Sequence, residues 1–212
     1  MRSLRYLSFA ACLALAACAG PEPAPTPTDA PTAPAAVTEA AWTLDPAASR
    51  LTYVSIKAGE IAEANRFDRL AGSVAADGTA SLAIDLASVN TGADLRDERM
   101  RDIFFQVADN PQANVTAQLD PAAFAGLAVG QALVRPLKAS VTIKGATGEV
   151  ATEVLVTRVS EDRVTVVPTA PVIVSTDMFG LTDELGELRA MAELPSISPA
   201  VPVSFILAFT RA

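Results

Sequence analysis

The segment Ser88-Val-Asn-Thr-Gly-Ala-Asp-Leu-Arg-Asp-Glu-Arg-Met-Arg-Asp-Ile-Phe-Phe105 decides the fold of this chain. An alternating apolar and polar pattern over residues 79–86 leads directly into it, which favours a β-strand followed by a helix. Thr91 and Asp94, three residues apart, form an N-terminal capping pattern, because both side chains can accept hydrogen bonds from the free amides of a first helical turn. We therefore expect a charged helix of about three turns in this segment.

One side of the expected helix is apolar. When successive residues are placed about 100° apart, the residues within one half of the helical wheel are Leu95, Met100, Ile103 and Phe104. Arg96 falls in the middle of this apolar arc. Because an unpaired buried charge costs several kcal/mol, the sequence predicts a carboxylate or carbonyl partner for the Arg96 guanidinium.

Alternating strands dominate the chain from residue 42 onward. They are expected at residues 49–57, 70–74, 79–86, 114–119, 130–137, 139–144, 149–159, 163–167, 172–174 and 203–209. Asp77-Gly78 is a hairpin signal, and residues 58–65 are expected to form a loop or short turn. A second helix is predicted over residues 179–191, because Leu181, Leu185, Leu188 and Met191 recur at helical spacing. The pattern predicts an all-β fold, an antiparallel barrel or sandwich with one or two short helices.

Composition excludes several classes of function. The formal net charge is −8, and without Arg2 and Arg5 of the predicted leader 14 basic side chains face 24 acidic ones, a net charge of −10. Phosphate backbones are repelled by such a chain, so we expect no nucleic-acid partner. The chain has no histidine, which excludes histidine triads, histidine metal sites and histidine pH switches. Its two cysteines lie within the first 18 residues, and we expect no metal and no cofactor.

Residues 1–17 are predicted to be a lipoprotein signal peptide. Arg2 and Arg5 precede an apolar run that is too short to span a bilayer. Leu15-Ala16-Ala17-Cys18 resembles a bacterial lipobox, which implies cleavage before Cys18, diacylation of its sulfur and acylation of the new amino group. The alternative is an ordinary Ala-x-Ala signal that is cleaved nearby. Ala19 in place of aspartate resembles the sorting rule for delivery to the outer membrane.

Residues 18–40 are predicted to be the lipidated cysteine and a tether rich in proline and alanine. Such a run cannot bury a core and favours extended polyproline-like conformations. At about 3.1 Å per residue, some 20 residues reach roughly 60 Å. The alternative is a docking motif for a proline-binding module, but the run shows no Pro-x-x-Pro with a flanking basic residue.

Several fixed spacings in and after the central segment resemble the signature of the YceI-like family. They are Ser88-Val89-x-Thr91, Arg96-Asp97-x-x-Met100-Arg101, Phe105, Pro111-x-Ala113 and the turn Gly145-Ala-Thr147. The resemblance spans residues 42–210 and implies that residues 41–212 form a secreted, lipocalin-like antiparallel barrel. It also implies an elongated cavity for a polyisoprenoid or other long-chain lipid, without catalysis. Many members have a histidine where this chain has Ile56-Lys57-Ala58-Gly59, which bears on the contact with the lipid headgroup.

The resemblance implies a set of ligand-binding residues around such a cavity. They are Phe67, Ile84, Leu86, Arg96, Met100, Phe104, Phe105, Val141 and Ile143. The plainer interpretation of the apolar members is an ordinary filled core, and it leads to an alternative function, a non-catalytic envelope module that acts through its surface on another protein. Arg96 could bind an anionic headgroup, but we favour an ion-paired staple between helix and barrel because acids and bases alternate along the segment.

Two further expectations concern chemistry and location. Lys57, Glu60, Glu63 and Asp68 follow the first strand and could place two carboxylates close together for acid–base catalysis, but a solvated loop is the favoured interpretation. With a lipid anchor, the protein is expected on the periplasmic face of the outer membrane, as a monomer or a homodimer.

Overall fold

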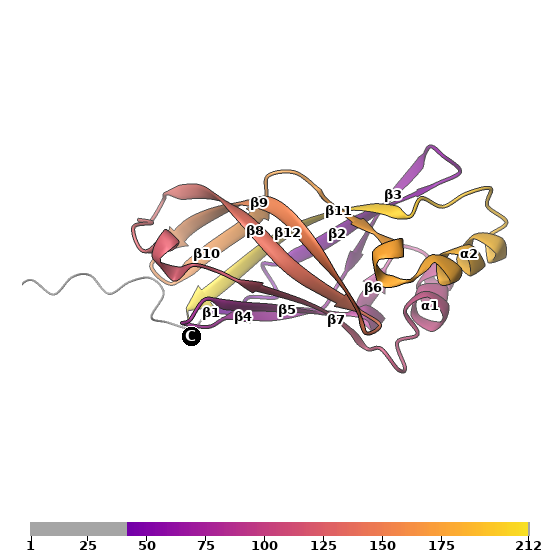
Figure 1. Ribbon diagram of the computed structural model, residues 1–212, viewed down its shortest axis with the longest axis horizontal. Helices are drawn as coiled ribbons and strands as arrows, with labels where there is room; N and C mark the ends of the chain where they lie inside the picture. The colour runs from indigo at the N-terminus through magenta and orange to yellow at the C-terminus, as the bar shows by residue number, and fades with distance from the viewer. Residues whose placement is uncertain (1–41, 212) are drawn as a thin grey trace, which may run out of the picture. The chain divides into compact units, whose positions relative to one another are not determined.

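The strands close on themselves into a ring. The computed structural model describes residues 42–211, and it confirms the predicted all-β fold as a lipocalin-like antiparallel barrel with two short α-helices (Figure 1). The predicted signal segment, Cys18 and the tether lie outside these residues. The strands are β1 (Trp42–Leu44), β2 (Arg50–Lys57), β3 (Ile61–Phe67), β4 (Leu70–Val74), β5 (Thr79–Asp85), β6 (Val89–Asn90), β7 (Gln112–Gln118), β8 (Ala132–Ile143), β9 (Ala146–Ser160), β10 (Arg163–Pro168), β11 (Val172–Ser175) and β12 (Ala200–Arg211).

Strand β12 closes the barrel. The ring runs in the order β1-β4-β5-β7-β8-β9-β10-β12, and β12 pairs back onto β1. The C-terminal half of β12 lies between β10 and β1, whereas its N-terminal half lies between β11 and β2. This strand therefore runs from one end of the barrel to the other, and its two halves have different neighbours.

Residues 58–65 were predicted to be a loop, and this prediction is wrong. The chain reverses at Ala58 and Gly59, which both have a positive φ, and returns as β3, which pairs with β2 along its whole length. The hairpin continues past the ring, where the backbone of Ala58 donates to Ser196 and that of Ser198 donates to Ile56. The alternating pattern was hidden because the side chains that β3 turns inward include Glu63 and Asn65.

The predicted strands at residues 130–137 and 139–144 form one strand, β8. It pairs with β9 from Ala132 to Ile143, but with β7 only around Val141. Pro136 lies in the part that has one strand neighbour, and a proline is tolerated at such an edge because a missing amide removes no ladder bond on the open side. The proline therefore does not end the strand.

The central helix has two parts, α1 (Asp94–Arg99) and the π-helical segment η2 (Met100–Phe105). The predicted cap is wrong: Ala93 is the N-cap residue, and Thr91 instead donates its backbone amide and its hydroxyl to Asp97 Oδ1, over 2.8 and 2.6 Å. Leu95 is also wrongly placed, since it is exposed. The π-helical turns are wider than α-helical ones, so the 100° spacing does not hold across the segment.

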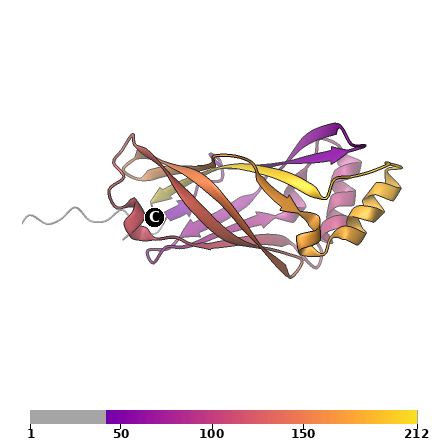
Figure 2. The ribbon, with the colours of Figure 1, turned by 45° about the horizontal axis from the view of Figure 1, so that its top comes forward.

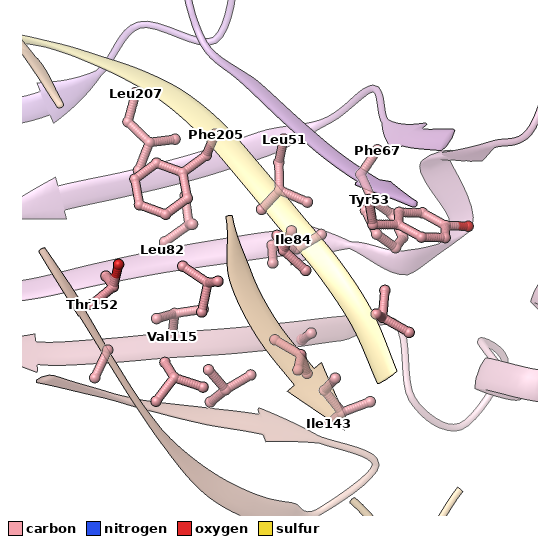
Figure 3. Close-up of a pocket in the computed structure, with 18 of the residues that line it drawn as sticks. Leu51, Tyr53, Phe67, Leu82, Ile84, Val115, Ile143, Thr152, Phe205 and Leu207 are labelled. Carbon is pink, nitrogen blue, oxygen red and sulfur yellow. The ribbon is translucent and has the colours of Figure 1, made fainter. Parts of the chain in front are cut away.

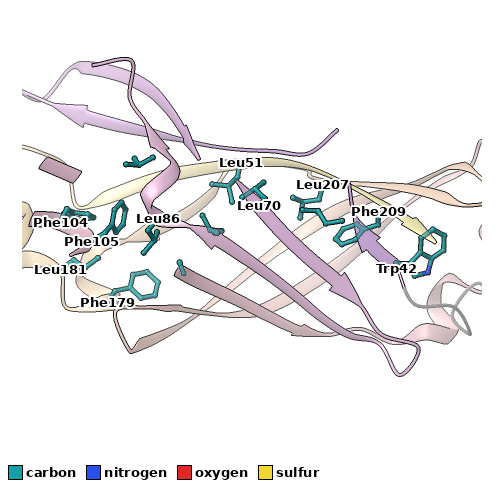
Figure 4. Close-up of a cluster of buried hydrophobic side chains, with 14 residues drawn as sticks. Trp42, Leu51, Leu70, Leu86, Phe104, Phe105, Phe179, Leu181, Leu207 and Phe209 are labelled. Carbon is teal, nitrogen blue, oxygen red and sulfur yellow. The ribbon is translucent and has the colours of Figure 1, made fainter. Parts of the chain in front are cut away.

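One buried apolar cluster extends along the barrel from end to end (Figure 4). Trp42 and Phe209 lie at one end, and the other end holds Phe104, Phe105, Phe179 and Leu181. At this second end α1 and α2 (Thr182–Met191) lie close to the projecting β2–β3 hairpin (Figure 2). None of the helices within residues 42–211 is long and apolar enough to cross a membrane. Three short 3-10 segments, η1 (Leu86–Ser88), η3 (Pro121–Phe124) and η4 (Thr176–Phe179), complete the domain.

Gly78 in the turn between β4 and β5 is expected to be essential for stability. Its φ is +86°, and a Cβ added there would lie 2.2 Å from the carbonyl oxygen of Leu119. We expect Gly78→Ala to lower the free energy of unfolding in urea by about 2–4 kcal/mol. Gly59→Ala is the matched control, because Gly59 has a φ of +82° but open space around it, and a cost of only about 1–2 kcal/mol is expected. Equal losses in the two variants would contradict the steric explanation.

Candidate functional site

The barrel encloses a cavity of about 600 Å³, a volume within the range of small-molecule sites. Its walls come from the inner faces of strands all round the ring, and most of the lining side chains are aliphatic or aromatic (Figure 3). Lining residues extend from Trp42 at one end of the barrel to Leu188 of α2 at the other. The core of this barrel is therefore not filled, contrary to the premise of the interaction-module alternative.

All nine predicted ligand-binding residues line this cavity. Phe67 comes from β3, four residues come from the α1–η2 segment, and the others are Ile84, Leu86, Val141 and Ile143, on β5, η1 and β8. That these residues bind a ligand remains a prediction. Lining residues outside the predicted set of nine include Leu51, Tyr53, Asn65, Val115, Val154, Val156, Val166, Phe205 and Leu207. Alternation along the strands was the signal that could have found most of them.

Four aromatic rings form a continuous row between the barrel wall and the helical segment. Ring centroids are 5.5 Å apart for Tyr53 and Phe67, 5.9 Å for Phe67 and Phe105, and 5.0 Å for Phe105 and Phe104. Such pairs contribute about 0.5–1.5 kcal/mol each beyond their buried area. The row fixes the η2 segment against β2 and β3, so that segment is a packed part of the cavity wall.

The inner face of the β2–β3 pair changes from apolar to charged along its length. Leu51 lies opposite Phe67, Tyr53 opposite Asn65, and Ser55 opposite Glu63, and all six side chains line the cavity. Lys57 follows on the same face of β2. We call the group of Tyr53, Ser55, Lys57, Glu63, Asn65 and Arg96 the polar end of the cavity.

Ion pairs and hydrogen bonds hold the polar end together. Glu63 Oε2 lies 2.9 Å from Lys57 Nζ and 2.5 Å from Arg96 Nη1, while Arg96 Nη2 donates to the Thr91 carbonyl over 2.6 Å. The predicted partner for Arg96 is thus present, and the contacts link α1 to β3 as a staple would. Hydrogen bonding from Lys57, then attraction to Arg96, lowers the pKa of Glu63. Glu63 was predicted to lie in a solvated loop, and this prediction is wrong, because the residue lies in β3.

A family model decides the relationship of this chain to known proteins. The model of the YceI-like domain matches residues 42–209, which is nearly the whole of the described barrel. The chain belongs to the YceI-like family. None of the curated proteins compared with it matches significantly.

Solved structures agree with this assignment. A polyisoprenoid binding domain from Saccharophagus degradans, implicated in plant cell wall breakdown, is 39% identical, with a TM-score of 0.79 over 82% of this chain and 99% of that chain. BcnA from Burkholderia cenocepacia shares the fold at 20% identity, with a TM-score of 0.60 over 78% of this chain and 98% of that chain. The YceI-like barrel described above thus has the same architecture as both.

In this YceI-like barrel, α2 covers the end of the cavity beside the polar end. Leu181, Leu185 and Leu188 face the cavity, but Met191, predicted on the same face, is exposed. Lys144 in the β8–β9 turn donates to Glu184 Oε1 over 2.5 Å, and both side chains are largely buried. The hydrogen bond from Lys144 lowers the pKa of Glu184.

The Lys144–Glu184 pair predicts a pH-dependent contribution to stability. Because the pKa of Glu184 is lowered in the folded state, its contribution is complete above the ordinary value of 4.5 and is lost as the pH falls through the lowered pKa. We expect Glu184→Gln to cost about 1 kcal/mol at pH 7, and the gap from the unchanged protein to close below pH 4.5. Urea unfolding between pH 3 and pH 8 measures this. Glu187→Gln, an exposed position on the same helix, is the control, and a constant gap for Glu184→Gln would contradict the assignment.

Proposed function

We propose that this YceI-like protein is a non-catalytic lipid-binding lipoprotein of the cell envelope. Its barrel takes up a polyisoprenoid or a similar long apolar molecule, which it sequesters or carries. The observation that supports this proposal is the cavity of about 600 Å³ with mostly apolar walls. The relative from Saccharophagus degradans, 39% identical, is described as a polyisoprenoid binding domain.

Binding in such a cavity would rest on the burial of apolar surface. Each Å² of apolar area removed from water contributes about 25 cal/mol, and an extended chain that follows the barrel contacts apolar side chains along most of its length. The charged groups of the polar end are engaged with one another, an arrangement that suits the orientation of a headgroup better than proton transfer. This supports a carrier role.

The sequence supports an attachment to the membrane. Residues 1–17 would direct export, acyl chains on Cys18 would anchor the mature chain, and residues 19–40 would separate the barrel from the bilayer. Three acyl chains, at about 0.8 kcal/mol per buried methylene, would hold the protein on the membrane. We place the barrel on the periplasmic face of the outer membrane.

The lipid that travels with the native protein tests this function. The full chain would be purified from the envelope of its own organism, extracted with organic solvent, and the extract quantified by mass spectrometry against the amount of protein. We expect close to one prenyl or similar long-chain lipid per protein molecule. An extract without such a lipid, together with no uptake of added prenyl lipids, would reject the carrier function.

A further inference from the structure

Three atoms of the polar end are buried without a hydrogen-bond partner. They are the Tyr53 hydroxyl, Asn65 Oδ1 and Arg96 Nε, and within residues 42–211 the one other such side-chain atom is Thr176 Oγ1 in η4. All four residues line the cavity. A buried polar atom without a partner costs about 1–3 kcal/mol, and most such atoms in native proteins are paired. Three of them within one small group indicate that a bound molecule provides the partners.

The hydrogen-bonding character of each atom is fixed by its surroundings. Asn65 is 3% exposed and donates from Nδ2 to the Glu63 carbonyl over 3.0 Å and to Ser55 Oγ over 3.1 Å. A carbonyl can only accept, so the amide nitrogen must face Glu63, and Oδ1 is left as an acceptor without a partner in the described protein. Arg96 Nε can only donate. Burial raises the pKa of Tyr53, with the charge of Asp97 acting in the same direction, so its hydroxyl stays neutral and can donate or accept.

A phosphate headgroup matches the free atoms less well than an uncharged group that both donates and accepts hydrogen bonds. Arg96 already donates from Nη1 to Glu63 and from Nη2 to the Thr91 carbonyl, so part of its hydrogen-bonding capacity is engaged within the protein. The Lys57 ammonium is paired with the same carboxylate oxygen. Asn65 Oδ1 would meet phosphate oxygens as one acceptor facing others. The free atoms instead require a ligand group that accepts from Arg96 or Tyr53 and donates to Asn65.

The apolar tail has room in the other direction. Tyr53 lies opposite Val203 of β12, and Trp42 lies opposite Arg211 of the same strand. At about 3.3 Å per residue, this part of β12 spans roughly 26 Å. In Figure 3 the Tyr53 hydroxyl points away from the aliphatic side chains Leu82, Ile84 and Leu207. A ligand whose head contacts Tyr53 can therefore extend its chain toward Trp42.

We propose that the polar end binds an uncharged headgroup that both donates and accepts hydrogen bonds, such as the terminal hydroxyl of a prenyl alcohol, and that it selects against a diphosphate on the same chain. Tyr53, Asn65 and Arg96 are the specificity-determining residues. This inference rests on the proposed lipid-binding function and specifies the chemical class of the ligand. Because the Tyr53 hydroxyl has no partner within the described protein, its removal leaves no other protein group unpaired.

A competition between three ligands with one shared chain tests the proposal. The delipidated full chain would be incubated in detergent with equimolar geranylgeraniol, geranylgeranyl diphosphate and the corresponding hydrocarbon, and the bound species counted by native mass spectrometry. We expect the alcohol to be favoured by about tenfold or more over the other two. In the Tyr53→Phe variant, affinity for the alcohol should fall roughly three- to tenfold, while hydrocarbon binding and the ligand-free unfolding midpoint should not change.

Each outcome separates this inference from the function on which it rests. Equal binding of all three ligands, unchanged in Tyr53→Phe, would overturn the headgroup assignment and leave lipid binding in place. A preference for the diphosphate would also overturn it, and would assign the head to cations such as Arg99, which lines the cavity as well. Binding of none of the three would count against the proposed function itself.

Discussion

Replacement of Val115 by tryptophan should empty the barrel of lipid. Val115 is on β7, where it lies between Leu82 of β5 and Val141 of β8, and all three side chains line the cavity. Leu82 and Val115 are labelled in Figure 3. An indole at this position would occupy the space that a chain running along the barrel must cross. We expect the amount of lipid that copurifies with the protein to fall by about tenfold or more, a change of ~1.4 kcal/mol or more in binding free energy.

Thr116→Trp is the matched control for this variant. Thr116 is the next residue of the same strand, and its side chain is exposed on the outside of the barrel, so the same substitution there should leave the lipid content unchanged. The cavity can accept the indole without overpacking because it is empty space, and unfolding in urea should show that both variants remain folded. Normal lipid content in folded Val115→Trp protein would show that the ligand does not occupy the barrel.

Replacement of Cys18 by alanine should release nearly all of the protein from the membrane. If acyl chains on Cys18 provide the anchor, as the Leu-Ala-Ala-Cys pattern predicts, the variant loses this anchor, since three chains at about 0.8 kcal/mol per methylene are lost. Membrane fractionation followed by immunoblotting measures the effect. We expect the unchanged protein in the membrane pellet and the variant outside it.

Cys12→Ala provides the comparison for the anchor experiment. Cys12 lies within the apolar run of the predicted leader, so its replacement should not affect the final location. An ordinary Ala-x-Ala signal would give a different pattern, in which neither substitution changes the fraction bound to membranes. Intact-mass measurement of the membrane form should also show added acyl groups on the mature protein that begins at Cys18.

Alternation made the inner faces of several strands predictable. Ile84, Val141 and Ile143 were found because apolar and polar residues follow each other at a period of two when one face is buried. Strand β3 was missed for the same physical reason, since it turns Glu63 and Asn65 into the cavity and breaks the pattern. A strand that contributes polar side chains to a site lacks the apolar and polar alternation that predicts a half-buried strand.

The helical segment shows a second limit. The apolar arc of the helical wheel assumes α-helical geometry throughout the segment. It correctly places Met100 and Phe104 against the cavity. The segment changes to π-helical geometry at Met100, so an arc drawn for one continuous α-helix does not hold across it, and Leu95 is exposed. Sequence could predict that Arg96 needs a partner, but it could not identify Glu63, because the position of β3 depends on the closure of the whole barrel.

The position of Trp42 makes it an intrinsic fluorescence probe of the cavity. It is the single tryptophan of the chain, it lines the cavity at the end opposite the helices, and it is 7% exposed (Figure 4). A lipid whose head lies at Tyr53 would alter the emission of this indole only if its tail is long enough to arrive there. A series of ligands with increasing chain length, read by fluorescence alone, would therefore show how much of the barrel each one fills.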